Sequence, residues 1–252
     1  HYFEHMAFKG TGTREVNAIR AFLSKNALSS NASTGRLETE YHAESVQRKW
    51  PLICDLLCDI YFNSIYPAEE IEKEKEVVLN EIARDWDNDN YRAYFALWEN
   101  LWEKNPMRIF GVGTLEGVQN INRDDLITGR NHWHIPSNTL AIATGNINHE
   151  EFVAAINKHV PLNGSKVLHP SWDDEYESLP QKSEVIIERP KREKAVIVYG
   201  CKFPLYVDER TSQTRQFLKY LLTSGHASIL WNEIREKRGL AYAVSGGVSG
   251  EY

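Results

Sequence analysis

Two histidines and a glutamate open the sequence in the stretch HYFEH, as His1, Glu4 and His5. On a helix, residues four apart share a face, so His1 and His5 can point at one ion. Imidazole is a good zinc ligand, and a catalytic zinc needs a third protein ligand and an open position for water. Glu4 lies beside the same face, where its carboxylate could take a proton from that water. The stretch predicts a zinc site; a surface helix that carries two histidines is the alternative.

The order H-x-x-E-H is the inverted form of H-E-x-x-H, a signature of zinc peptidases. A third ligand is expected elsewhere, and residues 70–82 (EIEKEKEVVLNEI) offer many carboxylates. Glu74 and Glu81 are seven apart, two turns of helix, so they share a face, and the valines between them make that face the inward one. Glu72 and Glu76 are expected to face solvent beside lysines. Ordinary ion pairs along a charged helix remain the alternative.

Composition limits the classes of function. The chain has 252 residues, 42% hydrophobic and 25% charged, as in an ordinary globular protein. A net charge of -6 gives no support for a nucleic-acid or anionic-membrane partner. No apolar run approaches the length of a membrane span. Three cysteines are too few for a disulfide framework. The compartment stays open between cytoplasm and periplasm.

The elements that must position these residues alternate between helices and strands. Helical spacing or helix-start residues predict helices over 16–23, 51–60, 67–82, 91–102, after Asn148, 217–222 and 228–234. Strand patterns predict strands over 28–34, 37–45, 139–147, 194–200 and after Tyr242. Periodicity is lost between residues 161 and 190, which we interpret as a domain linker. The order predicts an α+β fold, with helices packed on mainly antiparallel sheets.

Several motifs together resemble the pitrilysin/insulinase family of zinc metallopeptidases, and most closely its shorter bacterial and mitochondrial-processing-peptidase-like members. HYFEHMAFKGT resembles the zinc helix of the family. EKEVVLNEI matches the family pattern E-K-x-V-x-x-E-I and places Glu81 where the third ligand usually stands. SNAST (residues 30–34) resembles the strand that pairs with substrate, and REKRGLAYAV (residues 235–244) resembles an Arg and Tyr segment of the second domain.

The resemblance implies a role for each matching residue. Zn²⁺ would be held by His1, His5 and Glu81, and Glu4 would be the general base. Glu74 would support the site without binding the metal. The backbone of an extended substrate would pair with Asn31, Ala32, Ser33 and Thr34. Arg235 and Tyr242 would stabilise the substrate oxyanion; without the resemblance they read as an Arg at a helix end and a Tyr in the core.

The resemblance also implies a domain organisation. Residues 1–168 would form a zinc-binding catalytic domain that lacks its first strands. Residues 169–252 would contain the linker and the first part of a second, incomplete domain of similar type. Family members enclose a peptide substrate between two such halves, so we expect a homodimer or a second homologous half as partner. The free α-amino group of His1 would place positive charge near the metal and weaken zinc binding in this piece.

Two other functions remain open at this stage. A non-catalytic family member could keep the fold and bind peptide as a core subunit, although such members usually lose zinc-site residues. A zinc-stabilised structural domain would need a site closed by four protein ligands, and the sequence offers no convincing fourth.

Overall fold

The computed structural model describes residues 1–102, 105–161, 184–188, 193–202 and 208–248. Within it the chain forms two compact units, His1–Gly200 and Cys201–Tyr252. The boundary predicted at residue 168 and most of the predicted linker lie outside the described residues. The division into domains 1–168 and 169–252 therefore stays a prediction.

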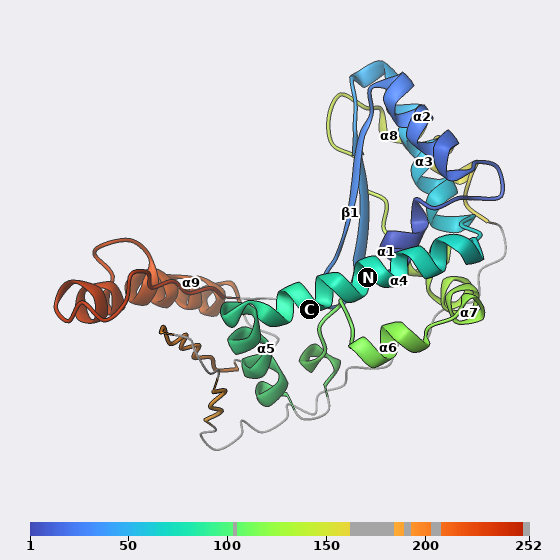
Figure 1. The fold of residues 1–252 in the computed structure, drawn as a ribbon. Helices are drawn as coiled ribbons and strands as arrows, with labels where there is room; N and C mark the ends of the chain where they lie inside the picture. The colour runs from blue at the N-terminus through green and yellow to red at the C-terminus, as the bar shows by residue number, and fades with distance from the viewer. Residues whose placement is uncertain (103–104, 162–183, 189–192, 203–207, 249–252) are drawn as a thin grey trace. The chain divides into compact units, whose positions relative to one another are not determined.

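The first unit contains most of the regular structure (Figure 1). Its elements in chain order are α1 (Tyr2–Ala7), α2 (Val16–Asn26), β1 (Ser29–Thr34), β2 (Thr39–Glu44), η1 (Gln47–Lys49), α3 (Trp50–Phe62), α4 (Ala68–Asp87), α5 (Asp89–Leu101), η2 (Pro106–Arg108), α6 (Leu115–Asn120), α7 (Arg123–Trp133), η3 (Pro136–Asn138) and α8 (His149–Asn157). The helices predicted over 16–23, 51–60, 67–82, 91–102 and after Asn148 are confirmed.

Local sequence explains where these helices begin. Pro51 lies in the first turn of α3 and Pro67 directly precedes α4, positions where a missing N–H costs no helical hydrogen bond. Asn148 starts α8 by accepting a hydrogen bond from the Glu151 N–H. Asn122 and Asp125 make a reciprocal capping box at the start of α7.

Helix α1 is only six residues long, and packing on two sides holds it. Tyr2 and Met6 belong to a buried cluster that also contains Tyr66 and residues of α4, α6 and α7. Ala7 belongs to a second buried cluster with Ile19 of α2 and residues of α3. The Tyr2 hydroxyl also donates a hydrogen bond of 2.5 Å to the Ile71 carbonyl of α4. So short a helix is marginal in isolation, so these contacts fix the residues that HYFEH supplies.

Strands β1 and β2 form an antiparallel hairpin, in which Asn31 pairs with His42 and Thr34 with Thr39. Along β2 the half-buried residues alternate with exposed ones, which is typical of a strand with one packed face and agrees with the strand predicted over 37–45. The Arg36 guanidinium links the hairpin tip to the neighbouring chain. It lies 3.9 Å from the Trp98 ring centroid and donates a hydrogen bond of 2.7 Å to the Met107 carbonyl. The small antiparallel sheet among many helices agrees with the predicted α+β class.

The strand predictions for 139–147, 194–200 and the described residues after Tyr242 (243–248) are wrong, because the structure assigns no strand in these ranges. Ile142 and Ile197 are 75% and 91% exposed in these segments. A strand needs a neighbour to complete its backbone hydrogen bonds, and in the described part of the chain β1 and β2 alone pair as a sheet. An apolar pattern is compatible with a strand, but it does not show whether a second strand is present to pair with it.

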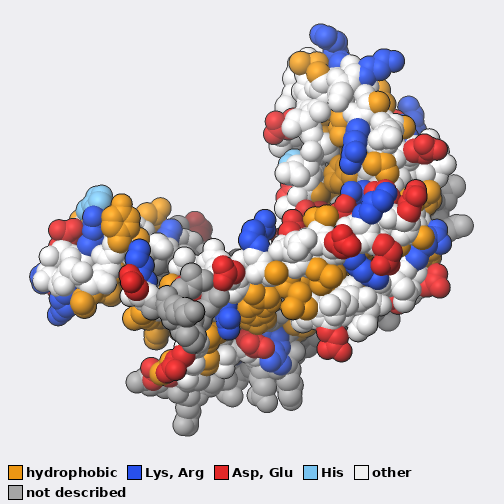
Figure 2. Space-filling model, viewed as in Figure 1, with side chains coloured by type: hydrophobic (Ala, Val, Ile, Leu, Met, Phe, Trp, Pro, Cys, Tyr) orange, Lys and Arg blue, Asp and Glu red, His pale blue; other side chains and the backbone are white. Residues whose placement is uncertain are grey.

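The second unit contains α9 (Glu209–Thr223) and the π-helical turn η4 (Trp231–Glu236), which confirms the helices predicted in these regions. Phe217 and Tyr220 of α9 are exposed, and Figure 2 shows hydrophobic side chains on the surface of this unit. No helix in the described ranges combines the length and the apolar character that crossing a bilayer requires.

Candidate metal centre

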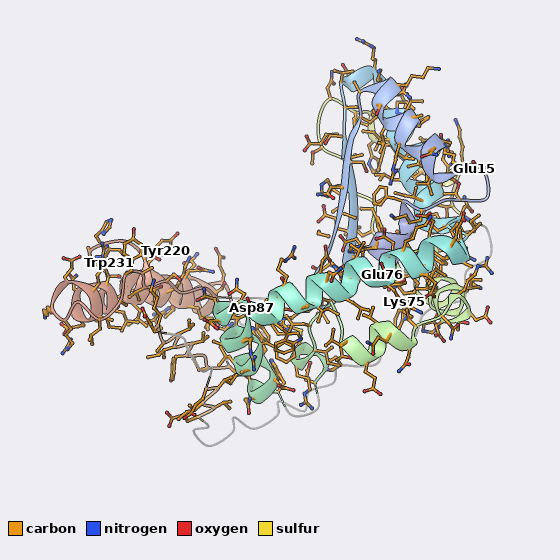
Figure 3. The ribbon with its side chains drawn as sticks, in the orientation of Figure 1. Glu15, Lys75, Glu76, Asp87, Tyr220 and Trp231 are labelled. Carbon is orange, nitrogen blue, oxygen red and sulfur yellow. The ribbon has the colours of Figure 1, made fainter. Side chains whose placement is uncertain are left out.

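Helix α4 carries glutamates on both its inner and its outer faces. Ile71, Glu74, Val78 and Ile82 are its buried residues, at helical spacing, and Glu81 lies partly exposed beside this stripe. Glu76 belongs to the exposed face, as predicted, and is labelled in Figure 3. The two glutamates singled out by their spacing therefore lie on the side of α4 that meets α1.

The structure brings His1, His5 and Glu81 together. One donor atom from each of the three lies within 4.8 Å of the other two. His1 Nε2 is 3.6 Å and His5 Nε2 is 3.4 Å from Oε2 of Glu81. The imidazole rings meet edge to face, with their centroids 4.7 Å apart.

The two distances to Glu81 are close to those between the ligands of a tetrahedral zinc ion. Zinc–nitrogen and zinc–oxygen bonds of about 2.0–2.1 Å at tetrahedral angles place neighbouring donors about 3.3–3.4 Å apart. Two imidazoles and one carboxylate are also a ligand set used by catalytic zinc sites, which leave the fourth position to water. In the described part of the chain this is the one group of three such residues with metal-binding spacing.

His5 is held from behind by Glu74. His5 Nδ1 lies 2.9 Å from Oε2 of Glu74, whose other oxygen accepts a hydrogen bond from the Lys9 ammonium. Burial raises the pKa of the Glu74 carboxyl, but the hydrogen bonds from Lys9 and His5 outweigh burial and lower that pKa below its usual value. An ionised Glu74 that accepts from Nδ1–H leaves Nε2 of His5 with its lone pair toward Glu81.

His1 has no comparable support. Its Nδ1 is buried and has no hydrogen-bond partner among the described residues.

Glu4 lies between the two histidines and points toward the hairpin. Its Oε2 accepts a hydrogen bond of 2.5 Å from the Thr34 hydroxyl at the end of β1. The Tyr41 hydroxyl of β2 is buried without a partner among the described residues, and burial, with the Glu4 charge as a smaller cause, raises its pKa. The Glu4 carboxylate therefore stands at the junction of α1 with the hairpin.

The hairpin places Asn31, Ala32, Ser33 and Thr34 in consecutive positions of β1. Asn31 and Ser33 are exposed, whereas Ala32 is buried. Within the described residues β1 pairs with β2 alone, so its other edge offers backbone groups to a further strand.

Arg235 and Tyr242 lie in the second unit, which is described by itself. The Arg235 guanidinium lies 4.2 Å from the Trp231 ring centroid and 5.4 Å from that of Tyr242. Tyr242 is 89% exposed, so the reading of it as a core residue does not hold within this unit. The oxyanion role of both residues stays a prediction.

Sequence reasoning overlooked two contacts at this site. Lys9 follows His5 by four residues, the same spacing that relates His5 to His1, and this repeat could have indicated that Lys9 reaches the same neighbours. The hydrogen bond from Thr34 to Glu4 joins residues 30 apart in the chain, and no local sequence pattern predicts it.

Comparisons with known proteins give two family matches that together cover nearly the whole chain. The family described as Insulinase (Peptidase family M16) matches residues 1–110, and the one described as Peptidase M16 inactive domain matches residues 120–252. The second match alone covers more than half of the chain.

Named relatives agree with these matches. An uncharacterized zinc protease of Rickettsia bellii is 32% identical over 97% of this chain and 58% of its own length. The mitochondrial-processing peptidase subunit beta of Caenorhabditis elegans is 31% identical over 63% of this chain and 35% of its own length. The chain thus spans little more than half of the Rickettsia protein.

Solved structures share the fold. A peptidase M16 inactive domain from Pseudomonas fluorescens matches with a TM-score of 0.74 at 17% identity, over 98% of this chain and 60% of that one. The first half of the periplasmic protease PqqL from Escherichia coli matches with a TM-score of 0.59 at 21% identity, over 67% of this chain and 38% of that one.

Proposed function

The chain belongs to the insulinase family of peptidases, family M16, and on that premise we propose that the intact protein is a zinc-dependent endopeptidase. The observation that carries the proposal is the cluster of His1, His5 and Glu81, with Glu4 beside it. Relatives named zinc proteases support zinc as the metal. The proposed substrates are peptides or unfolded segments that lie extended beside β1.

The residues of the cluster divide the work of peptide hydrolysis. His1, His5 and Glu81 would hold zinc, which when bound polarises the scissile carbonyl and acidifies the attacking water. Glu4 accepts the proton of that water and passes it to the leaving amine. Glu74 orients the His5 ring through Nδ1, so that the ring presents Nε2 to the site.

The peptide would bind by strand addition. Its backbone would pair with Asn31 to Thr34 along the edge of β1 that β2 leaves open, so affinity comes from the main chain and preference from side-chain pockets. Arg235 and Tyr242, from this chain or from a partner half, would approach the substrate carbonyl and stabilise its oxyanion. A second homologous half is the proposed partner, because the matching E. coli structure is the first half of a larger protease.

One observation favours a second function. Residues 120–252 match a domain described as inactive, so this chain could belong to a subunit that binds peptide without cutting it. The two functions share the fold and differ in chemistry. The presence of His1, Glu4, His5 and Glu81 together favours the peptidase.

The test uses the intact protein. Metal analysis should give about one zinc for each site, and a fluorogenic unstructured peptide should be cleaved. Removal of metal with a chelator should abolish cleavage, and added zinc should restore it, because the water is activated only in the loaded site. Zinc binding without cleavage of any of a diverse peptide set would favour the non-catalytic subunit. Absence of zinc binding would overturn the metal site itself.

A further inference from the structure

We propose that Thr34 is a positioning residue for Glu4, the proposed general base, because the Thr34 hydroxyl fixes the Glu4 carboxylate. The inference rests on the proposed function and adds a role for a side chain in a strand otherwise assigned to backbone pairing. The hydrogen bond from Thr34 Oγ1 to Glu4 Oε2 measures 2.5 Å and links β1 to α1. A hydroxyl bonded to a carboxylate is a charge-assisted contact, stronger than one between neutral groups.

Glu4 needs such an anchor. A glutamate side chain has three torsions, and a base that must meet one water molecule loses efficiency when it is free to rotate. Thr34 holds Oε2, and the Glu4 carboxylate makes no other hydrogen bond within the described residues. The second oxygen, Oε1, is therefore available to accept the proton of a water bound beside His1 and His5.

Thr34 is itself held on several sides. It pairs with Thr39 across the hairpin, with the two hydroxyl oxygens 3.5 Å apart. A Cβ atom on Gly111 would lie 2.7 Å from the Gly35 carbonyl oxygen and 3.1 Å from Thr34 Cγ2. Because Gly111 has no Cβ, the tip of the β1–β2 hairpin can pack closely against the backbone there. The β-branch further limits χ1 of Thr34. The hydroxyl is thus a rigid anchor.

One residue then serves both binding and chemistry. The main chain of Thr34 would pair with the peptide, while its side chain sets the position of the base. A peptide seated against β1 is thereby placed at a fixed offset from Glu4. Thr34 alone therefore sets the distance between the peptide-binding strand and the Glu4 carboxylate. A change that lets the hairpin move would displace this carboxylate even if the peptide still binds.

The experiment compares Thr34→Val, Thr34→Ser and Thr39→Val in the intact protein. Thr34→Val keeps the shape and removes the hydroxyl. We expect kcat to fall about 10- to 100-fold, with KM, zinc content and melting temperature close to wild type. Thr34→Ser restores the hydroxyl and should recover most of the kcat. Thr39→Val makes the same change across the hairpin and does not touch Glu4; it removes only the 3.5 Å contact with the Thr34 hydroxyl, so its loss of kcat should be clearly smaller than that of Thr34→Val.

A double variant supplies a readout that a merely structural role would not give. If Thr34 acts through Glu4, then Glu4→Gln/Thr34→Val should be no slower than Glu4→Gln alone. A rise in KM at unchanged kcat, a Thr34→Ser variant as slow as Thr34→Val, or zinc lost from Thr34→Val would overturn the inference. So would an unimpaired Thr34→Val in an enzyme that cleaves peptides. An inactive wild type would instead overturn the proposed function, and this role with it.

Discussion

His5 Nδ1 lies 2.9 Å from Oε2 of Glu74, across the contact between α1 and α4. An ionised carboxylate can only accept a hydrogen bond, so it fixes the proton on Nδ1 and leaves the lone pair on Nε2. That Nε2 is 3.4 Å from Glu81 Oε2. The hydrogen bond to Glu74 therefore orients His5 Nε2 as the proposed zinc site requires.

Replacing Glu74 by Gln should weaken zinc binding without removing a ligand. The amide keeps the size of the side chain but loses its charge toward His5 and Lys9. Loss of such an outer partner typically costs about 10- to 100-fold in metal affinity or activity. Competition with a chelator measures the affinity. Glu76→Gln, on the exposed face of the same helix, is the control, and equal affinities in both variants would contradict the role given to Glu74.

Glu81→Gln should have the larger effect on the metal. It removes the anionic oxygen that lies 3.4–3.6 Å from both imidazole Nε2 atoms. Zinc affinity should therefore fall further than in Glu74→Gln, and peptide cleavage should partly return when zinc is added in excess. Metal titration followed by the cleavage assay checks both points. Cleavage that is low at every zinc concentration, with normal metal content, would place Glu81 outside the ligand set.

Glu4→Gln should separate the base from the ligands. The amide cannot take the proton of the attacking water, so kcat should fall by at least about 10²–10⁴-fold. Zinc stoichiometry should stay near that of the wild type, because Glu4 is not a ligand in this mechanism. Metal analysis and cleavage are measured on the same preparation. A variant that loses its zinc, or that cleaves peptide at the wild-type rate, would refute this role of Glu4.

A buried carboxylate beside α1 should control stability in acid. Asp59 of α3 is buried and accepts hydrogen bonds from Thr11 (2.8 Å), Thr13 (3.0 Å), Asn63 (3.1 Å) and Arg14 (2.5 Å). Burial raises the pKa of Asp59, but these hydrogen bonds outweigh burial and lower that pKa below its usual value. Because the folded pKa lies below the unfolded one, the stabilisation is present above the unfolded pKa and is lost as pH falls through the folded pKa.

Asp59→Asn should therefore lower the free energy of unfolding by about 1–3 kcal/mol at neutral pH. The difference from wild type should shrink below about pH 4, where the unfolded carboxyl becomes protonated. Urea denaturation at neutral and acid pH measures it. Glu40→Gln, which removes an exposed carboxylate of β2, should change little at either pH. A difference that stays constant with pH would show that charge is not the cause.

Local sequence determined much of the candidate site. The spacing of His1, Glu4 and His5 predicts one helical face, and the seven-residue spacing of Glu74 and Glu81 predicts another. These patterns depend only on the 3.6-residue repeat of a helix, so the spacing of residues in the sequence is enough to show which of them share a face. The capping Asn148 and the prolines near α3 and α4 are local in the same way, and these helices are confirmed.

Tertiary structure alone decided which of these residues meet. Thr34 reaches Glu4 and Lys9 reaches Glu74 because α1 packs between α4 and the hairpin, a consequence of two buried clusters assembled from distant segments. The segments 139–147 and 194–200 show the converse: they carry an apolar strand pattern, but they have no pairing strand among the described residues and are largely exposed. Contacts between elements depend on partners remote in the chain. The free energy of burial or strand pairing arises only when both partners meet, so the sequence of one segment does not reveal it.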